Sequence, residues 1–169
     1  MLGKEWTVVK VPYGGGYCSL NIAKPKNTKT APNALQKEFE RLKIFTADNG
    51  ELINDLKWYE MDINFRHQNT RKNWAKIDDD LSFKLRNLFS ISLQKLLFVG
   101  GSHTITYLTF KAMSDVLVVQ SGLVVLDAHP DCCKKADWPI HSDWLRCLIE
   151  RRLILPENIL SFSKVIFIA

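Results

Sequence analysis

The chain has 169 residues, of which 46% are hydrophobic and 24% are charged, with only 8 Gly and 6 Pro. This composition is typical of a globular domain and excludes collagen-like, low-complexity and intrinsically disordered chains. The net charge of +5 comes mainly from lysines near residues 24–29. They do not form the dense basic stripe that a phosphate backbone requires, so we expect no nucleic-acid partner.

Neither a targeting segment nor a membrane span is predicted. The longest apolar stretch, residues 116–126, is interrupted by Gln120-Ser121-Gly122 and is shorter than the ~20 residues that a membrane helix needs. The four cysteines lie in a chain without a predicted signal peptide, so we expect reduced thiols and a cytoplasmic protein. The adjacent pair Cys132-Cys133 does not have the spacing of a zinc site.

The first half of the chain alternates between predicted strands and helices. The β-branched run 6–11 predicts a strand. A helix is predicted from Pro32, where apolar residues recur at helical spacing: Leu35, Phe39, Leu42 and Phe45. A weaker alternation predicts a strand over residues 59–63. A second helix is predicted to begin at Asp78, with a buried stripe of Leu81, Leu85, Leu88 and Ile91.

The second half has a sharper pattern. Apolar strands are predicted at 96–99 and 123–126, helices at 103–113 and 141–152, and a β-rich segment at 159–168. Strands that are apolar on both faces and alternate with helices predict a parallel sheet covered on both sides. Because the run 165–169 has the composition of a buried central strand, we expect residues 1–169 to be a single but incomplete α/β domain.

Polar residues that can bind a metal follow the two strongest predicted strands. Asp127, His129 and Asp131 follow one strand, and His103 follows the other after Gly100-Gly101. In an extended segment alternate side chains point the same way, and open α/β sheets place ligand sites at the carboxyl ends of their strands. We therefore expect the four side chains to lie within about 8 Å of one another around a metal centre.

Carboxylates combined with imidazoles suit Mn²⁺, Fe²⁺ or Zn²⁺, and a set without thiolates favours manganese. The alternative is structural: Asp127 caps a turn, His129 lies on the surface and Asp131 is solvated. The repeated pattern after two buried strands favours metal binding.

The segments Gly100-Gly101-Ser102-His103 and Asp127-Ala128-His129-Pro130-Asp131 resemble the first two metal motifs of the ureohydrolases, the arginase and agmatinase superfamily. The resemblance implies a three-layer α/β/α fold with a mainly parallel sheet. It also implies two Mn²⁺ ions that activate a bridging hydroxide, which attacks the guanidinium carbon of a small substrate and releases urea. A complete member is expected to be a homo-oligomer.

By position, the resemblance implies that His103 and Asp131 bind one manganese ion, that His129 binds the other, and that Asp127 bridges both and is catalytic. It also implies a catalytic role for His141, which lies where agmatinase-like members have a histidine that moves protons or orients the substrate. In those members a glycine follows this histidine, whereas Ser142 follows it here.

The resemblance has two departures. Ser102 replaces the aspartate of the first motif, which affects the orientation and affinity of the ligands more than metal binding itself. The third motif, with two further aspartates, and the later glutamate that holds the guanidinium group cannot be placed in the sequence.

Trp138 and Trp144 are interpreted as packing residues.

Three interpretations remain open. The chain is the N-terminal portion of a manganese enzyme acting on agmatine or arginine. Alternatively, it is a truncated or split-gene fragment that binds metal weakly and is inactive without a complementary C-terminal half. A third alternative is an unrelated zinc or iron hydrolase.

Overall fold

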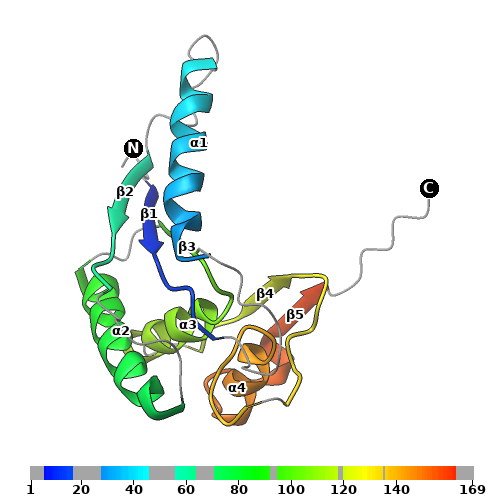
Figure 1. The fold of residues 1–169 in the computed structure, drawn as a ribbon. Helices are drawn as coiled ribbons and strands as arrows, with labels where there is room; N and C mark the ends of the chain where they lie inside the picture. Colours follow the sequence, from blue (N-terminus) through cyan, green and yellow to red (C-terminus); the bar gives the residue numbers. More distant parts are fainter. Residues whose placement is uncertain are drawn as a thin grey trace, which may run out of the picture.

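A computed structural model describes residues 6–16, 28–45, 56–63, 71–91, 95–117, 120–134 and 136–162 (Figure 1). Strands and helices alternate over these residues, as the sequence predicted. They are β1 (Trp6–Val11), η1 (Thr28–Thr30), α1 (Ala31–Phe45), β2 (Leu56–Glu60), α2 (Arg71–Ile91), β3 (Lys95–Gly100), α3 (Ile105–Val116), β4 (Leu123–Leu126), α4 (Trp144–Glu150), η2 (Pro156–Asn158) and β5 (Ile159–Phe162).

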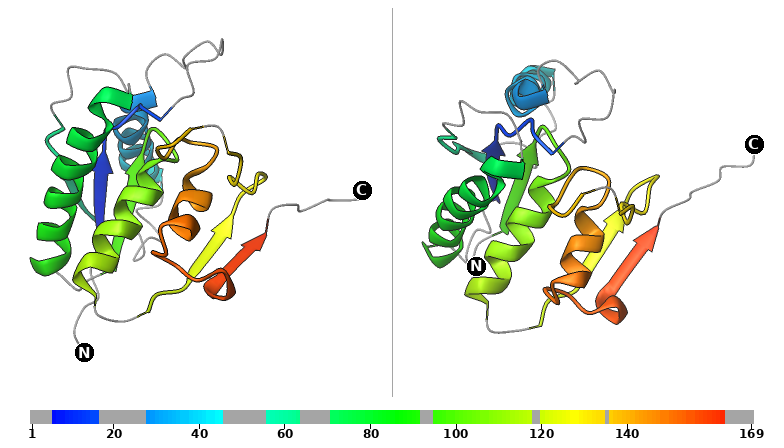
Figure 2. Two further views of the ribbon diagram at one scale, coloured as in Figure 1. Left: turned by 90° about the horizontal axis from the view of Figure 1, so that it is seen from below. Right: turned by 60° about the horizontal axis from the view of Figure 1, so that its bottom comes forward.

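The described strands form two parallel sheets. One has the order β2-β1-β3, and the other consists of β4 and β5. Val8 is paired with Leu97 in the first sheet, and Leu123 with Ile159 in the second. The sheets stand side by side, with β4 nearer than β5 to the three-stranded sheet (Figure 2). Parallel pairing requires a long connection between partners, which the intervening helices provide.

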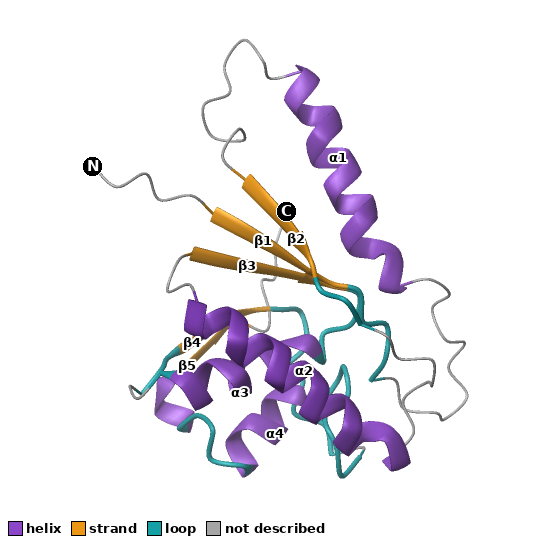
Figure 3. Ribbon diagram, turned by 90° about the vertical axis from the view of Figure 1, so that its left-hand side faces the viewer, coloured by secondary structure: helices purple, strands orange, loops and turns teal. Residues whose placement is uncertain are grey.

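Helices cover both faces of the three-stranded sheet. Helix α1 lies on one face, and α2 and α3 lie on the other, next to α4 (Figure 3). The core between the sheet and α2 and α3 contains side chains that are almost fully buried, among them Val9, Val11, Leu81, Leu85 and Leu108. Burial of this apolar surface is the main force that holds the layers together. The predicted three-layer α/β/α fold is confirmed.

Helix α2 begins earlier than predicted, at Arg71 instead of Asp78. Trp74 and Ile77 are buried and extend the stripe of Leu81 and Leu85 toward the N-terminus. Asp78 is not at the start of the helix but is buried within it, where it accepts hydrogen bonds from Ser82 and from Lys111 of α3. The carboxylate of Asp78 therefore connects α2 to α3 through Lys111 and does not stabilise the start of a helix.

Three further expectations about the elements need correction or fall outside the described residues. Strand β2 covers Leu56–Glu60, a few residues before the predicted 59–63. In α1, Phe39 packs its ring against Trp58, but Leu35 is exposed instead of buried. The side chains of Leu42 and Phe45 and the run 165–169 lie outside the described residues.

Strand β4 is not covered on both faces as predicted. Val125 is buried, whereas the neighbouring Val124 and Leu126 are 63% and 80% exposed. Because side chains alternate along a strand, these two point away from the buried face, where none of the described helices covers them. Among the described helices, none is both long enough and apolar enough to cross a membrane.

Candidate metal centre

His103 lies in the tight turn that connects β3 to α3. The turn passes directly against η1: a β-carbon on Gly101 would lie only 2.1 Å from the carbonyl oxygen of Thr28. Glycine is therefore needed there for close backbone approach. Within the turn, the buried hydroxyl of Ser102 donates to Thr104 Oγ1 at 3.2 Å. Ser102 thus stabilises the loop that carries His103.

Asp127 and Asp131 follow β4, but the segment between them is bent instead of extended. The backbone N–H of His129 donates to Oδ1 of Asp127 at 2.9 Å, which turns the chain. Asp131 has a φ of +46°, in the left-handed region that aspartate tolerates better than most residues. The prediction that alternate side chains share one side of an extended run is therefore wrong.

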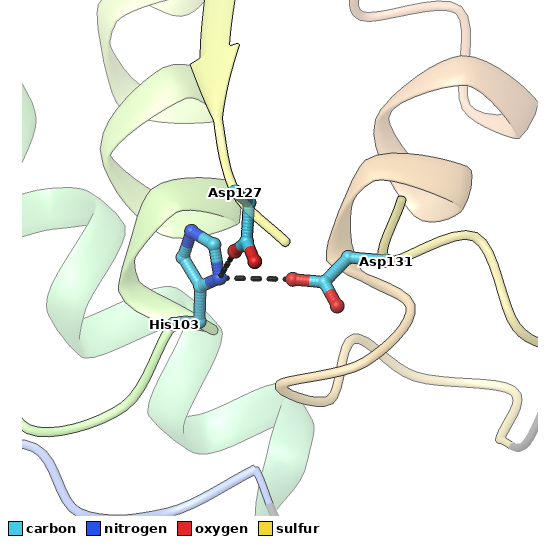
Figure 4. Close-up of side chains that lie close together, drawn as sticks. All are labelled: His103, Asp127 and Asp131. Atoms are coloured by element: carbon cyan, nitrogen blue, oxygen red, sulfur yellow. Dashed lines mark ion pairs between the residues drawn. The ribbon is translucent and has the colours of Figure 1, made fainter. Parts of the chain in front are cut away.

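The bend nevertheless brings both carboxylates to the same imidazole. Nδ1 of His103 lies 3.1 Å from Oδ2 of Asp127 and 2.8 Å from Oδ2 of Asp131 (Figure 4). One ligand atom from each of the three residues lies within 4.8 Å of the others. The side chain of Asp131 is 9% exposed, and those of Asp127 and His103 are 22% and 37% exposed. The group is thus partly sheltered and reachable from solvent.

Two carboxylates this close to each other repel, and a positive group between them offsets that repulsion. A neutral imidazole offers at most one N–H at Nδ1, which cannot serve both acids fully. A divalent cation satisfies all three groups at once. Oxygen and imidazole donors without a thiolate fit Mn²⁺, Fe²⁺ or Zn²⁺, so the residues present fit one ion of the predicted class.

His129 lies outside this three-residue group. Its side chain is 81% exposed, and its Nδ1 atom is 3.7 Å from Oδ1 of Asp127, beyond hydrogen-bond distance. The bend that turns Asp131 inward leaves His129 on the surface. The structure therefore brings three of the four predicted ligands together, and a metal-binding role for His129 stays a prediction.

His141 contacts the loop of His103 indirectly. Its backbone N–H donates to the carbonyl oxygen of Gly16 at 2.8 Å, and its Nδ1 atom lies 2.9 Å from the same oxygen. Because a carbonyl only accepts, Nδ1 carries the proton in this contact. Gly16 has a φ of +86°, and a β-carbon there would lie 1.9 Å from Oγ1 of Thr104. His141 is not part of the three-residue group, and its catalytic role stays a prediction.

Trp144 belongs to the site, whereas the sequence predicted only a packing role for it. Its indole N–H donates to Oδ2 of Asp131 at 2.6 Å, and its ring centroid is 4.8 Å from that of His103. The side chain is almost completely buried. The helical spacing around Trp144 indicates burial, but no signal in the sequence indicates that its N–H meets Asp131. Trp138 does pack, since its ring stacks on Trp74.

A buried ion pair fixes the start of α4, which carries Trp144. Asp143 accepts hydrogen bonds from the backbone N–H of Ile140 at 2.8 Å and from Arg146 Nη2 at 2.9 Å. The same Nη2 atom donates to the carbonyl oxygen of Ala136. Burial lowers the pKa of Arg146, but the hydrogen bond to Asp143 and the nearby negative charges, including those of Asp143 and Glu150, together outweigh it, so the pKa is raised overall. These contacts hold the loop before α4 in place.

The cysteines near the site are free thiols. Cys132 and Cys133 are exposed and Cys147 is buried, and none of these three forms a disulfide. Burial raises the pKa of Cys147 to about 11 and also raises that of Cys132. None of the three belongs to the His103 group. Cys18 lies outside the described residues.

Comparison with known proteins connects this geometry to a family. The model of the Arginase family matches residues 5–163. No individual curated protein is matched. Similar solved structures include the formimidoylglutamase of Bacillus subtilis, with a TM-score of 0.72, 19% identity, and coverage of 93% of this chain and 47% of that one.

Two further structures show the same fold. The proclavaminate amidino hydrolase of Streptomyces clavuligerus has a TM-score of 0.66 and 23% identity, over 94% of this chain and 50% of that one. The arginase of Bacillus subtilis has a TM-score of 0.62 and 18% identity, over 94% of this chain and 55% of that one. The chain thus spans about half the length of these solved structures.

Proposed function

The chain belongs to the Arginase family. We propose that it is the N-terminal portion of a manganese-dependent hydrolase that releases urea from a linear guanidino compound, and that it binds one of the two metal ions. The observation that carries this proposal is the convergence of His103, Asp127 and Asp131 within 4.8 Å. Agmatine and arginine are the substrates we favour. The free thiols are compatible with a reducing compartment, and we place the protein in the cytoplasm.

Each site residue has a distinct proposed role. His103 and Asp131 would hold one ion, His129 would help to hold a second, and Asp127 would contribute to both. Asp127 suits this role because its two oxygens face different ways, Oδ2 toward His103 and Oδ1 toward the backbone of His129. When bound, such ions lower the pKa of a coordinated water and supply a nucleophile near neutral pH.

His141 is proposed to orient the substrate or move a proton. Its Nδ1–H is fixed on the carbonyl oxygen of Gly16, which makes Nε2 the basic nitrogen of the neutral ring. Gly16 in turn contacts the turn that carries His103. A proton accepted at Nε2 would therefore be held at a defined position relative to the metal group.

The isolated chain is expected to bind one Mn²⁺ ion weakly and to be inactive. A guanidinium carbon is a poor electrophile, so its hydrolysis needs two ions and a carboxylate that holds the cationic substrate. In the described part of the chain, His103, Asp127 and Asp131 form the one cluster suited to a metal. The test is urea release from agmatine and arginine by the purified chain with excess Mn²⁺. Turnover at ~1 per second or more would show that the chain's own residues suffice.

A second candidate function is that of one half of a two-part enzyme, which would present open strand edges like those between the two sheets. In the described residues, no strand pairs with the outer edge of β3 or with the edge of β4 nearest to it. An apolar pocket of about 430 Å³ lies there, lined by side chains of α2, β3, α3 and β4 that include Phe89, Phe98, Phe110, Met113 and Leu123.

The proposed occupant of this gap is a pair of strands from the complementary half, apolar on both faces and parallel to β3 and β4. Such strands would satisfy the open backbone groups of both edges. Their carboxyl ends would lie beside His103 and Asp127, where further carboxylates would complete the site. This proposal agrees with the coverage of only about half of the solved structures.

The two candidates are separated by the coding sequence downstream. An in-frame continuation with a further aspartate motif supports a single longer enzyme, and a separate frame supports a split protein. In either case, co-expression of both parts is expected to give a stable complex that releases urea with Mn²⁺. A complex without activity on any guanidino compound would contradict the proposed reaction. The family match leaves the interpretation as an unrelated zinc or iron hydrolase without support.

A further inference from the structure

We propose that Trp144 is a positioning residue that holds two of the metal ligands, Asp131 and His103, in their binding geometry. This inference rests on the proposed metal-binding function. The indole N–H donates to Oδ2 of Asp131 at 2.6 Å, and the indole ring lies 4.8 Å from the imidazole of His103, tilted by 47°. A single buried side chain thus contacts residues from two different loops.

Asp131 needs such a partner because of its backbone conformation. Its φ of +46° lies in the left-handed region, which is sparsely populated even though aspartate tolerates it better than most residues, so surrounding contacts help to maintain it. The strand does not dictate this conformation, since β4 ends at Leu126. The hydrogen bond from Trp144 fixes the carboxylate from the protein interior. The carboxylate is thereby held toward Nδ1 of His103 instead of turning to solvent.

The support for Trp144 is itself rigid. Trp144 is the first residue of α4 and is 1% exposed. The preceding residue, Asp143, is fully buried and is paired with Arg146. The indole therefore has little freedom to move, and an N–H at a fixed position orients a ligand more strongly than a mobile one would.

The neutral indole suits this task. The indole N–H donates one hydrogen bond and accepts none, so it cannot bind the cation in place of Asp131. Its ring fills the space next to His103 without adding charge. A residue that only filled space would not need a hydrogen bond from its N–H to the carboxylate of Asp131. The contact therefore links packing of α4 to the affinity for the metal.

The test compares two tryptophan variants. Trp144→Phe keeps an aromatic ring but removes the N–H, and Trp138→Phe makes the same change at a tryptophan that stacks on Trp74 outside the metal group. The Kd for Mn²⁺ is measured by calorimetry on folded protein, well below the unfolding temperature of each variant. We expect Trp144→Phe to raise the Kd about 10- to 100-fold and Trp138→Phe to leave it within about twofold of the wild type.

The outcomes separate this inference from the proposed function. If the wild type binds Mn²⁺ and Trp144→Phe binds it equally well, the inference fails and the metal site stands. If the wild type does not bind Mn²⁺ at all, both fail. A loss of stability in both variants with loss of affinity only in Trp144→Phe supports a positioning role beyond a structural one.

A second measurement on the unmodified chain applies if Trp144→Phe does not fold. The protein has 5 tryptophans, each with one indole N–H that is visible by ¹⁵N NMR. Mn²⁺ is paramagnetic and broadens the nearest signals first. At substoichiometric Mn²⁺ we expect the indole signal of Trp144, assigned from its contacts with His103 and Asp131, to disappear before the others. A Trp144 signal that persists while the backbone signals of His103 and Asp131 disappear would overturn the inference alone, and equal broadening of all the indole signals would overturn the metal site as well.

Discussion

Nδ1 of His103 lies 2.8 Å from Oδ2 of Asp131, although the two residues follow strands of different sheets. His103 follows β3 of the three-stranded sheet, and Asp131 follows β4 of the two-stranded sheet. Asp127, directly after β4, also reaches His103. The proposed metal centre therefore joins the carboxyl ends of both sheets. A cation bound there would hold the two sheets together and would also lower the pKa of a coordinated water.

Replacing Asp127 with alanine is expected to abolish Mn²⁺ binding by the chain. Asp127 contributes an oxygen to the metal group, and its other oxygen forms the turn that directs Asp131 inward. Its loss thus removes one ligand and releases a second. Calorimetric titration with Mn²⁺ checks this, with Asp79→Ala, an exposed acid on α2, as the control. Unchanged affinity in Asp127→Ala would mean that the ion binds elsewhere.

Gly101→Ala is expected to destabilise the protein and weaken metal binding together. The new methyl group would lie 2.1 Å from the carbonyl oxygen of Thr28, so the backbone of the His103 turn must shift. Overpacking of this kind costs about 1–3 kcal/mol in the free energy of unfolding. The matched control is Gly122→Ala, whose methyl group would meet its nearest neighbour at an ordinary 3.5 Å. Equal stabilities in thermal unfolding would contradict the close approach.

The protein is expected to lose stability in alkaline solution as the buried thiol of Cys147 titrates. Burial raises the pKa of this thiol from 9.0 to about 11. Above pH 9 the unfolded chain therefore loses a proton that the folded chain retains. This contribution to stability is complete below pH 9 and is lost as the pH rises toward 11, with a slope of at most about 1.4 kcal/mol per pH unit.

The corresponding variant is Cys147→Ala, measured by urea unfolding between pH 7.5 and 11. Its free energy of unfolding is lower at neutral pH because a small cavity is left, but its fall above pH 9 is expected to be shallower than in the wild type. Burial also raises the pKa of Tyr107, from 10.0 to about 12, so some decline above pH 10 persists in both proteins. Identical slopes between pH 9 and 10 would contradict the assignment to Cys147.

The sequence predicted the elements that position the site and the residues that follow them. The apolar runs of β3 and β4 end abruptly at glycines or at an aspartate, and this local signal does not depend on tertiary contacts. We predicted the meeting of His103 with Asp127 and Asp131 from strands that end at one edge of a single sheet. The structure instead places β3 and β4 in two sheets, and their carboxyl ends still bring the three residues together.

The bend after β4 could not be predicted from the sequence. Alternation in an extended segment placed His129 beside Asp127, but a local hydrogen bond and the left-handed conformation of Asp131 redirect the chain. The partner that accompanies this conformation, Trp144, comes from a distant helix. Likewise, the sequence predicted that Asp78 begins a helix, whereas in the structure Asp78 lies within α2 and pairs with Lys111 of α3. Such long-range contacts leave no periodic signal.

The central claim is that His103, Asp127 and Asp131 bind one divalent cation. The most direct test is a crystal structure of the chain grown with Mn²⁺ and measured for anomalous scattering. We predict an anomalous peak bonded to one atom of each of these residues, at the meeting point of the two sheets, and no such peak in crystals of Asp127→Ala. A fully ordered site without an ion, or a peak coordinated by other residues, would contradict the account.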